Sequence, residues 1–463
     1  MTPIEELKAI VGPQGWTNDA SDLEPHLNER RGAVTGRTAV MLSPSSTQQV
    51  SDIVRVCGRH KIGLVPQGGN TGLCGGAIPD QSGAQVLLST SRMNGIRSVD
   101  PDDASITVEA GCILADVQAA AEKAGRLFPL SLSAEGSCQI GGNLSTNAGG
   151  INVIRYGNAR DQVLGLEVVL ADGTVWNGLR SLRKDNAGYD MKQVFIGSEG
   201  TLGIITAATL RLYASPGETA TALLAISSAD KAVALFGHMQ TCLGDNILAF
   251  ELMSDRCLRL VARHVSGLRY PFEESHDWYV LTEVAVSDGG ISMETALADA
   301  METDLLRDAI VAKNEGEAGQ LWRLRHSISD AQRPEGACLK HDISLPIGRL
   351  GEFLDRSREL IAEMQPEGRL VAFGHVGDGN LHYNVMQPLG ADPAAFMSAG
   401  RALTTAIYDL VAELGGSFSA EHGIGVTKKG DLERFRGGVE LELMRTLKKA
   451  LDPDNILNPG KVI

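Results

Sequence analysis

The sequence lacks any run of 18 uncharged apolar residues, so we expect no membrane-spanning helix. It also lacks a basic N-terminal region followed by an apolar stretch, which argues against a secretory signal. The N-terminal segment is poor in arginine and therefore does not resemble a transit peptide. We expect a cytoplasmic protein, or a protein of the mitochondrial matrix if a transit peptide has been removed.

The chain has few cysteines and no surplus of positive charge. Its seven cysteines are scattered and form no CxxC pair, which is typical of buried thiols in a reducing compartment. The 42 lysines and arginines are outnumbered by 57 aspartates and glutamates, so the net charge is −15. This balance argues against nucleic acid or an anionic membrane as a partner, although a small anion could still bind a local group of basic side chains.

Glycine, by contrast, is abundant: 53 of the 463 residues are glycines, and nearly half of them lie in five windows. The windows are residues 63–76, 136–165, 197–203, 374–379 and 415–430. Glycine is needed where the backbone turns with a positive φ or approaches another group closely. Because 43% of the residues are hydrophobic and 21% are charged, we expect a folded protein of two or three domains.

The hydrophobic pattern predicts mixed α and β structure throughout. Helices are expected at residues 47–59, 113–124, 229–242, 293–308, 351–364, 396–414 and 439–450. Strands are expected at residues 62–66, 84–89, 106–108, 163–170, 174–176, 206–212, 219–226, 247–252, 278–286, 371–373 and 381–385. Asp172 and Gly173 predict a hairpin turn, and Pro216-Gly217 marks a domain boundary. We therefore predict an α+β fold with two main domains and a C-terminal extension.

Two glycine-rich loops in the first half are suited to a ligand with phosphate groups. The first, PQGGNTG at residues 66–72, can point several backbone N–H groups at one anion. It matches neither GxGxxG nor GxxxxGK[ST], so the nicotinamide and Walker interpretations fail, whereas a glycine-rich hairpin remains possible. The second, SCQIGGNLSTNAGG at residues 137–150, consists mostly of small, amide and hydroxyl residues and could also be a surface loop. Two such loops in one domain favour a large cofactor.

Together with IGSEGTLGIIT at residues 196–206 and LNPGK at residues 457–461, these loops resemble the PCMH-type FAD-binding domain of the vanillyl-alcohol-oxidase-type flavoproteins. The resemblance covers nearly the whole chain. It implies a two-part FAD-binding domain at residues 1–216, an α+β substrate and metal domain with an antiparallel sheet at residues 217–425, and a helical segment at residues 426–463 that returns to the FAD domain. The first loop contains Asn70 and no histidine to which FAD could be attached, so we expect non-covalent FAD.

The same resemblance implies which residues contact FAD. The first loop would hold the pyrophosphate through backbone N–H groups, the second would run beside the flavin and its ribityl chain, and Ile205 would lie near the adenine. The full set is Pro66, Gly68, Gly69, Asn70, Thr71, Gly72, Ser137, Gly141, Gly142, Asn143, Thr146, Asn147, Gly149, Glu199, Gly200, Ile205 and Asn458.

Two glycine-rich loops in the second half carry histidines. GHVGDGNLH at residues 374–382 contains His375 and His382, and Asn384 follows His382 at the strand period of two, on the same face. SAEHGIG at residues 419–425 contributes Glu421 and His422. Each histidine alone fits a hydrogen-bonded core or loop residue. Together, two imidazoles and a carboxylate are typical of a zinc site that keeps a position open for substrate.

These two motifs resemble the C-terminal domain of the FAD-linked D-2-hydroxyacid dehydrogenases, most closely the D-2-hydroxyglutarate dehydrogenases, with D-lactate dehydrogenases and glycolate oxidase flavoprotein subunits as near relatives. The resemblance implies that His375, His382 and Glu421 bind a metal and that His422 is the base. Zinc is the first choice, and manganese, cobalt and iron stay open because such ligands discriminate poorly. In this chemistry the base takes the hydroxyl proton, the metal acts as a Lewis acid, and the hydride of C2 goes to flavin N5.

Basic side chains could bind the carboxylates of such a substrate. Arg325 and Ser329 lie four residues apart, so we expect them on one face of a helix, and Lys340 follows shortly. Charge alone would also fit a solvated basic face. The resemblance makes Arg325, Ser329, Lys340 and Asn384 substrate residues, with arginine able to grip a carboxylate bidentately. Ser329 stands where the closest relatives tend to have threonine, which leaves D-2-hydroxyglutarate, D-lactate, D-malate and glycolate open as substrates.

Two other functions are compatible with part of the sequence. A metal-dependent hydrolase would use the histidines and the glutamate but would leave the runs at residues 140–150 and 196–203 unexplained. A flavin-carrying subunit could work only inside a larger electron-transfer complex. No motif marks the electron acceptor, which could be an electron-transfer flavoprotein, a quinone or a cytochrome, and the lack of a nicotinamide fingerprint argues against NAD. A homodimer is one option for the oligomeric state.

Overall fold

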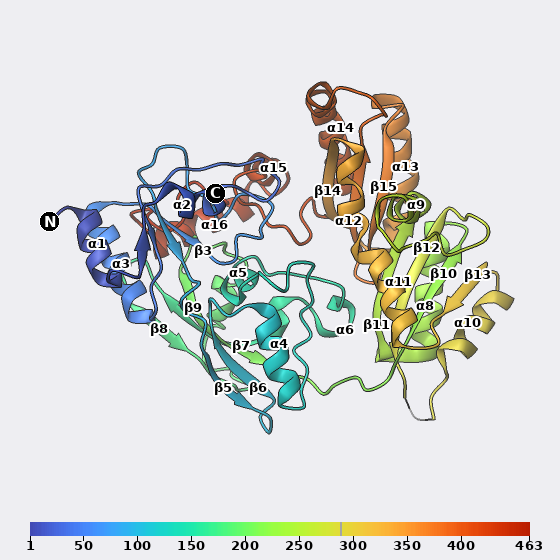
Figure 1. The fold of residues 1–463 in the computed structure, drawn as a ribbon, viewed down its shortest axis with the longest axis horizontal. Coiled ribbons are helices and arrows are strands. Elements are labelled where there is room, and N and C mark those ends of the chain that lie inside the picture. The colour runs from blue at the N-terminus through green and yellow to red at the C-terminus, as the bar shows by residue number, and fades with distance from the viewer. Residues whose placement is uncertain (288) are drawn as a thin grey trace. The chain divides into compact units, whose positions relative to one another are not determined.

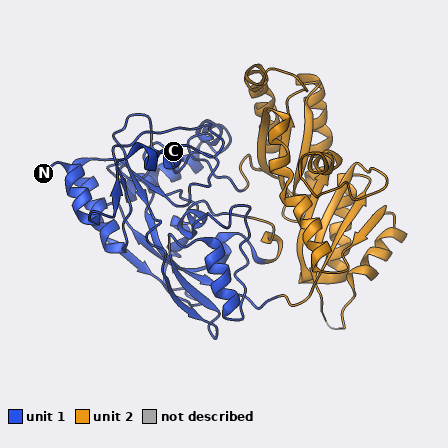
Figure 2. Ribbon diagram, in the orientation of Figure 1, with its two compact units in different colours: residues 1–149, 156–215, 421–463 blue, residues 150–155, 216–420 orange. Residues whose placement is uncertain are grey.

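The computed structural model describes residues 1–287 and 289–463, which form two compact units (Figure 1, Figure 2). Unit 1 consists of Met1–Gly149, Tyr156–Ser215 and Glu421–Ile463, and unit 2 of Gly150–Arg155 and Pro216–Ala420. The first boundary differs by one residue from the predicted one. Residues 421–425 belong to unit 1 and not to the second domain, and the short segment 150–155 belongs to unit 2.

The first sheet of unit 1 has four strands in the order β1 (Trp16–Thr17), β2 (Met41–Leu42), β4 (Val86–Ser89) and β3 (Leu64–Gln67). Strands β2 and β3 both run parallel to β4. Helices α1 (Pro3–Val11) and α3 (Thr47–His60) pack on each other and on this sheet. The buried face of α3 follows from the helical spacing of Val50, Ile53, Val54 and Cys57.

The second sheet of unit 1 is antiparallel, with the order β5 (Ile96–Asp100), β6 (Ser105–Glu109), β9 (Ile204–Arg211), β7 (Val163–Val169) and β8 (Val175–Gly178). The predicted hairpin is confirmed, because Val169 pairs with Val175 and Gly173 adopts a φ of 78° in the turn. Helices α4 (Leu114–Lys123) and α5 (Ile140–Ser145) contribute to the core that this sheet covers.

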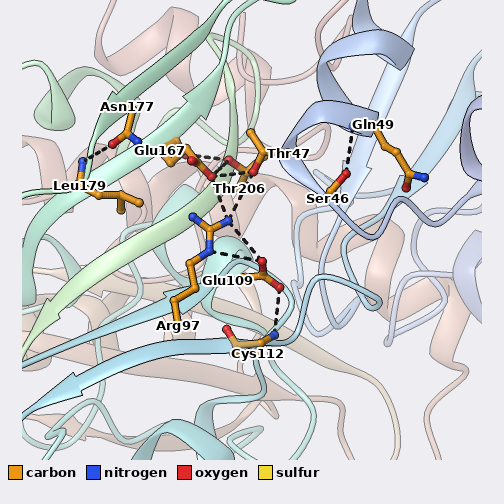
Figure 3. A network of polar contacts seen from close by, with 11 residues as sticks. Ser46, Thr47, Gln49, Arg97, Glu109, Cys112, Glu167, Asn177, Leu179 and Thr206 are labelled. Carbon is orange, nitrogen blue, oxygen red and sulfur yellow. Dashed lines mark hydrogen bonds and ion pairs between the residues drawn. The ribbon is translucent and has the colours of Figure 1, made fainter.

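A buried carboxylate connects this sheet to α3 (Figure 3). Glu167 on β7 accepts hydrogen bonds from Thr47 (2.6 Å) at the start of α3 and from Thr206 (3.0 Å) on β9. Arg97 on β5 lies 3.1 Å from the same carboxylate and 3.2 Å from Glu109. The carboxylate of Glu167 thus contacts two hydroxyl groups and a guanidinium that it shares with Glu109, consistent with the partners that a buried carboxylate requires.

Unit 2 contains one seven-stranded antiparallel sheet. Its order is β13 (Asp308–Val311), β10 (Thr219–Ile226), β12 (Trp278–Ala285), β11 (Ile247–Ser254), β15 (Arg369–His375), β16 (Asn380–Met386) and β14 (Cys338–Ser344). Helices α9 (Asp255–His264), α11 (Glu315–His326) and α12 (Ile328–Ala331) share one core with the sheet. Four more helices, α8 (Ala229–Leu243), α10 (Met293–Glu302), α13 (Leu350–Met364) and α14 (Pro393–Glu413), pack on one another and on the strands. The predicted α+β fold with an antiparallel sheet in the second domain is confirmed.

One helix ends earlier than predicted. The pattern at residues 293–308 favoured a single helix, but α10 ends at Glu302, and Asp304 turns the chain with a φ of 60°. Residues 308–311 then form β13 at the edge of the sheet. Leu306 is buried but lies after the end of the helix, and its apolar side chain made the helical pattern look longer than the helix is.

The C-terminal residues return to the first sheet of unit 1. Helices α15 (Lys429–Phe435) and α16 (Val439–Leu451) precede a segment that pairs with β3. The N–H of Leu64 donates to the oxygen of Ile456 (2.7 Å), and the N–H of Asn458 donates to the oxygen of Leu64 (2.8 Å). Among the described residues, no helix is both long and apolar enough to span a membrane.

Candidate active site

The two predicted cofactor loops touch each other inside unit 1. A Cβ on Gly69 would lie 2.0 Å from the carbonyl oxygen of Ser137, and a Cβ on Gly68 would lie 3.6 Å from the Cα of Gly142. The two backbones therefore leave no room for a side chain at residue 69. Asn70 adopts a φ of 51°, and its side chain donates to the carbonyl oxygens of Pro25 and Asn28 on the neighbouring segment.

Backbone donors of the first loop are available to a ligand. Within the described part of the chain, the N–H groups of residues 69–72 donate no hydrogen bond, and a Cβ on Gly72 would meet no atom within 4 Å. Successive N–H groups around a residue of positive φ form a concave nest that suits a phosphate. These residues therefore fit a cofactor with a pyrophosphate.

The second predicted loop is in part a helix, since Ile140–Ser145 within it form α5. The Thr146 hydroxyl donates to the carbonyl oxygen of Gly142 (3.1 Å), and the Asn147 side chain accepts from the N–H of Arg160 (2.9 Å). The side-chain nitrogen of Asn143 is buried and lies 3.5 Å from Sγ of Cys138. A Cβ on Gly142 would meet no atom within 4 Å. The polar side chains thus shape the loop, and Gly142 leaves space beside it.

The remaining predicted cofactor residues lie close to these loops or end them. Gly200 has a φ of 73°, and a Cβ there would lie 2.6 Å from Cγ of Pro66, so this glycine is needed for close packing. Ile205 is buried in β9. Gly149 is the last residue before the chain passes to unit 2.

Glu199 holds the loop that follows the predicted base. Its carboxylate accepts from the N–H groups of Ile424 (2.7 Å) and Gly425 (2.8 Å). Burial raises the pKa of Glu199, although the two N–H donors and Lys428 act in the opposite direction. Asn458 donates to the carbonyl oxygens of Glu199 (2.7 Å) and Gly76 (2.9 Å). Both side chains connect protein segments, and their contact with FAD stays a prediction.

In unit 2, strand register places several predicted residues on one face of the sheet. Directly opposed residues of neighbouring strands share a face. The opposed pairs are Lys340 and Asn384, Asp342 and His382, Phe373 and His382, and Glu251 and His375. The rings of His375 and His382 lie 5.8 Å apart. The structure therefore brings two predicted metal ligands and two predicted substrate residues onto one surface.

A buried carboxylate that the motifs did not reveal connects this face to Arg325. Glu251 is 0% exposed, and its two oxygens contact Nδ1 of His375 (2.5 Å) and the Nε of Arg325 (2.8 Å). Burial alone would raise the pKa of Glu251, but His375 and Arg325 lower it to about 2. A carboxylate on Nδ1 directs the other ring nitrogen outward, as in most histidines that bind a metal.

The sequence around Glu251 indicates a buried charge, although no motif includes this residue. It is the one charged residue in Ile247–Ser254, a strand whose other large side chains are apolar and all of whose residues are buried. A charge in such a strand needs a partner. Asp342 on β14 is a similar case, since it is buried, accepts from the side chain of Asn380 (3.0 Å) and lies 3.8 Å from His382.

The prediction that Arg325 and Ser329 share one helix face is wrong. Helix α11 ends at His326, Ser327 interrupts the helix, and α12 begins at Ile328. Arg325 is buried whereas Ser329 is exposed, so the two side chains have different surroundings. The spacing of four residues misled because the interruption falls between them. Asn384, by contrast, is buried and donates to the Gln332 side chain (3.1 Å).

Glu421 and His422 open the last segment of unit 1. They directly follow Ala420, the last residue of unit 2, whose N–H donates to the carbonyl oxygen of Asp342 (3.3 Å). The histidines 375 and 382 thus belong to one unit, and the predicted third ligand and base belong to the other. Their joint role stays a prediction.

Two family models match the chain, one in its N-terminal half and one in its C-terminal half. Residues 38–178 match the family model "FAD binding domain", and residues 215–462 match "FAD linked oxidases, C-terminal domain". The chain is 41% identical to the mitochondrial D-2-hydroxyglutarate dehydrogenase of Bos taurus over 99% of this chain and 83% of that one. It is 35% identical to a putative mitochondrial D-lactate dehydrogenase of Schizosaccharomyces pombe, over 99% and 90% of the two chains.

The fold also matches a solved flavoenzyme. The structure of p-cresol methylhydroxylase with substrate bound superposes with a TM-score of 0.76 at 16% identity, over 99% of this chain and 96% of that one. At this identity the likeness concerns the fold alone. The C-terminal family model spans more than half of the chain, and the bovine relative is matched over most of its length. The protein therefore belongs to the family of FAD-linked oxidases and is an FAD-dependent oxidoreductase.

Proposed function

We propose that the protein oxidises a D-2-hydroxyacid to the 2-oxoacid, with D-2-hydroxyglutarate as the first candidate. The observation that carries this proposal is the shared sheet face of unit 2, where His375, His382, Asn384 and Lys340 lie in register. An FAD-linked oxidase needs such polar groups to position a charged substrate. The curated relatives named above act on acids of this class by their names.

The donor set fits a divalent metal. His375 and His382 would be two ligands, and Glu421 would be the third. Zinc suits two imidazoles and a carboxylate, and manganese, cobalt or iron could occupy the same set. When bound, such an ion supplies a Lewis acid for the substrate hydroxyl and carboxylate. Glu251 would orient His375 for this role through the 2.5 Å contact at Nδ1.

His422 would take the proton of the substrate hydroxyl. A neutral imidazole is suited to this step near neutral pH. The position of His422 depends on the residues that follow it. Glu199 holds two of these residues, because its carboxylate accepts from the N–H groups of Ile424 and Gly425. When bound, FAD supplies the hydride acceptor at N5.

Two cationic side chains would bind the substrate carboxylates. Arg325 uses Nε and Nη2 for Glu251, which leaves Nη1 for a ligand as far as the described residues show. Lys340 lies opposite Asn384 on the sheet face. Ser329 would contribute a hydroxyl, although its exposure and its separate helix make it the weakest member of the set.

The same site could accept D-lactate, as the name of the fission yeast relative suggests. D-lactate has one carboxylate, whereas D-2-hydroxyglutarate has two. The presence of both Arg325 and Lys340 favours the dicarboxylate, because each carboxylate then has a cationic partner.

Anaerobic bleaching of the flavin tests the substrate and the metal together. The holoenzyme is mixed with D- and L-2-hydroxyglutarate, D-lactate, D-malate and glycolate, with and without a chelator. We expect rapid bleaching by D-2-hydroxyglutarate and its loss on chelation. Bleaching by an L-acid alone would overturn the substrate proposal, and indifference to the chelator would overturn the metal.

Substitution of the proposed base tests the mechanism. His422→Ala should lower turnover about 10²–10⁴-fold, the usual contribution of a general base, while the flavin content stays unchanged. Steady-state kinetics and the flavin absorbance of the purified variant measure both. Turnover near the wild-type rate would remove His422 from the reaction.

A further inference from the structure

An open cavity of about 500 Å³ in unit 2 is lined by five arginines, four of which are exposed, although the protein carries a net charge of −15. The five are Arg256, Arg259, Arg263, Arg358 and Arg369. They come from α9, from α13 and from the first residue of β15. The volume of the cavity lies in the range of pockets that hold small ligands, about 300–1,000 Å³.

Nearby carboxylates neutralise only part of this charge. Asp255 pairs with Arg259 at 2.5 Å. Glu335 contacts Arg263 at 3.2 Å and also pairs with Arg369, so that one carboxylate serves two guanidinium groups. Asp277 also lines the cavity, so five arginines face three carboxylates, Asp255, Asp277 and Glu335.

Two of the five arginines are not neutralised by an ion pair with a described residue. Arg256 and Arg358 form no ion pair with any residue that the structure describes. The guanidinium of Arg358 lies 5.3 Å from the centre of the Trp278 ring, a distance typical of a cation–π contact. Partial burial and the neighbouring Arg369 lower the pKa of Arg256, although Asp255 and Glu335 act in the opposite direction. An anion in the cavity would relieve this repulsion.

The cavity is separate from the proposed site of oxidation. Arg369 is the first residue of β15 and His375 is the last. A strand of seven residues spans roughly 20 Å, so Arg369 and His375 lie that far apart. A substrate held near His375 cannot account for the arginines at the other end.

We propose that this cavity binds a small polyvalent oxyanion, a molecule with two or more negative charges on carboxylate or phosphate groups. Arginine forks bind both groups bidentately, and several forks around one cavity favour multiply charged ligands over single charges. The N-terminus of α9, a helix of ten residues, opens at the same place and adds partial positive charge.

Calorimetric titration of the holoenzyme at low ionic strength tests the proposal. Tricarballylate represents the carboxylates and inorganic phosphate the phosphates, with acetate as the singly charged control. We expect millimolar or tighter binding of at least one polyvalent anion, and the stronger of the two identifies the ligand class. The double variant Arg256→Gln/Arg358→Gln should bind it about ten-fold more weakly or worse.

A matched control separates the cavity from general charge. Arg307→Gln removes an exposed guanidinium of unit 2 that does not line the cavity, and it should leave the affinity unchanged. Turnover of the hydroxyacid should stay near wild type in the double variant. Absence of binding by both polyvalent anions, or equal binding by the double variant and wild type, overturns the proposal.

Chemical protection tests the wild-type protein without substitutions. Phenylglyoxal modifies accessible arginines, and mass spectrometry of the peptides locates the modified ones. The anion that binds should slow modification of Arg256 and Arg358 and leave Arg307 unaffected. Equal modification with and without the anion would contradict the proposed site.

Discussion

Glu199 in unit 1 and Glu251 in unit 2 are buried carboxylates held in opposite ways. Glu199 accepts from two backbone N–H groups, whereas Glu251 contacts a guanidinium and an imidazole. Burial raises the pKa of Glu199, whereas His375 and Arg325 lower that of Glu251 to about 2. Both carboxylates nevertheless position residues of the proposed site. Glu199 holds the loop that follows His422, and Glu251 contacts His375.

One residue type can therefore organise a site in two ways. A carboxylate held by backbone N–H groups fixes the course of a loop, and its effect does not depend on which side chains the loop carries. A carboxylate held by side chains fixes their orientation instead. Removing Glu251 leaves the guanidinium of Arg325 buried without a counter-charge, but removing Glu199 leaves neutral donors, and the expected costs differ accordingly.

Glu251→Ala should have the largest effect. It leaves Arg325 buried without its counter-charge, which typically costs about 3–5 kcal/mol. Denaturant unfolding measures this loss. Because His375 also loses its partner at Nδ1, metal affinity in a chelator competition should fall about 10–100-fold.

A second variant separates the two roles of Glu251. Glu251→Met combined with Arg325→Met removes both charges and should recover much of the stability, because apolar side chains of similar volume can replace an ion pair. Its metal affinity should stay low, since His375 still lacks its partner. Full stability of the single variant would show that the pair contributes little.

Glu199→Ala should have an intermediate effect. Two buried N–H groups lose their acceptor, and each such donor typically costs about 1–3 kcal/mol, less where water can reach it. We expect the free energy of unfolding to fall by about 2 kcal/mol and kcat to fall with it, because the loop after His422 loosens. Glu199→Gln offers one acceptor oxygen and should fall between wild type and alanine. Equal values for both variants would contradict the two-donor arrangement.

The smallest effect is a difference in pH dependence. Glu335, held like Glu251 by cationic groups, has its pKa lowered from 4.5 to about 2 by His264 and Arg369. Its contribution to stability is complete above 4.5 and is lost as the pH falls toward 2. The raised pKa of Glu199 works the other way, so its contribution is present below 4.5 and is lost as the pH rises through the folded-state pKa.

Unfolding at a series of pH values between about 3 and 7 measures both slopes. The stability difference between wild type and Glu335→Gln should grow with rising pH, and the difference between wild type and Glu199→Gln should shrink. Parallel slopes would contradict the opposite shifts, a pKa of Glu199 raised by burial and a pKa of Glu335 lowered by its partners.

Local patterns predicted most of the secondary structure. The strand Thr219–Ile226 has the predicted bounds, and the hairpin at Gly173 forms where Asp172-Gly173 indicated it. Such elements depend on the alternation of side chains and on turn residues that lie close together in the chain. The interruption at Ser327 lies inside an apolar pattern that continues across it, so the pattern could not reveal it.

Long-range partners could not be predicted in the same way. Glu251 is 74 residues from Arg325 and 124 from His375, and the sheet order alone brings them together. The contact of Glu199 with Gly425 spans 226 residues. Motifs identified the histidines because they recur in a family, but the residues that hold them carry no motif.

The division of unit 1 into three segments has a consequence for synthesis. Its last segment, Glu421–Ile463, supplies the chain that pairs with β3 and the N–H groups that satisfy Glu199. A ribosome completes every residue of unit 2 before it makes this segment, so unit 2 can finish folding while unit 1 still waits for its closing piece. Domains often fold in the order in which they are made, but here the N-terminal unit is completed last. A chain truncated after residue 420 should therefore yield a folded unit 2 and an incomplete unit 1.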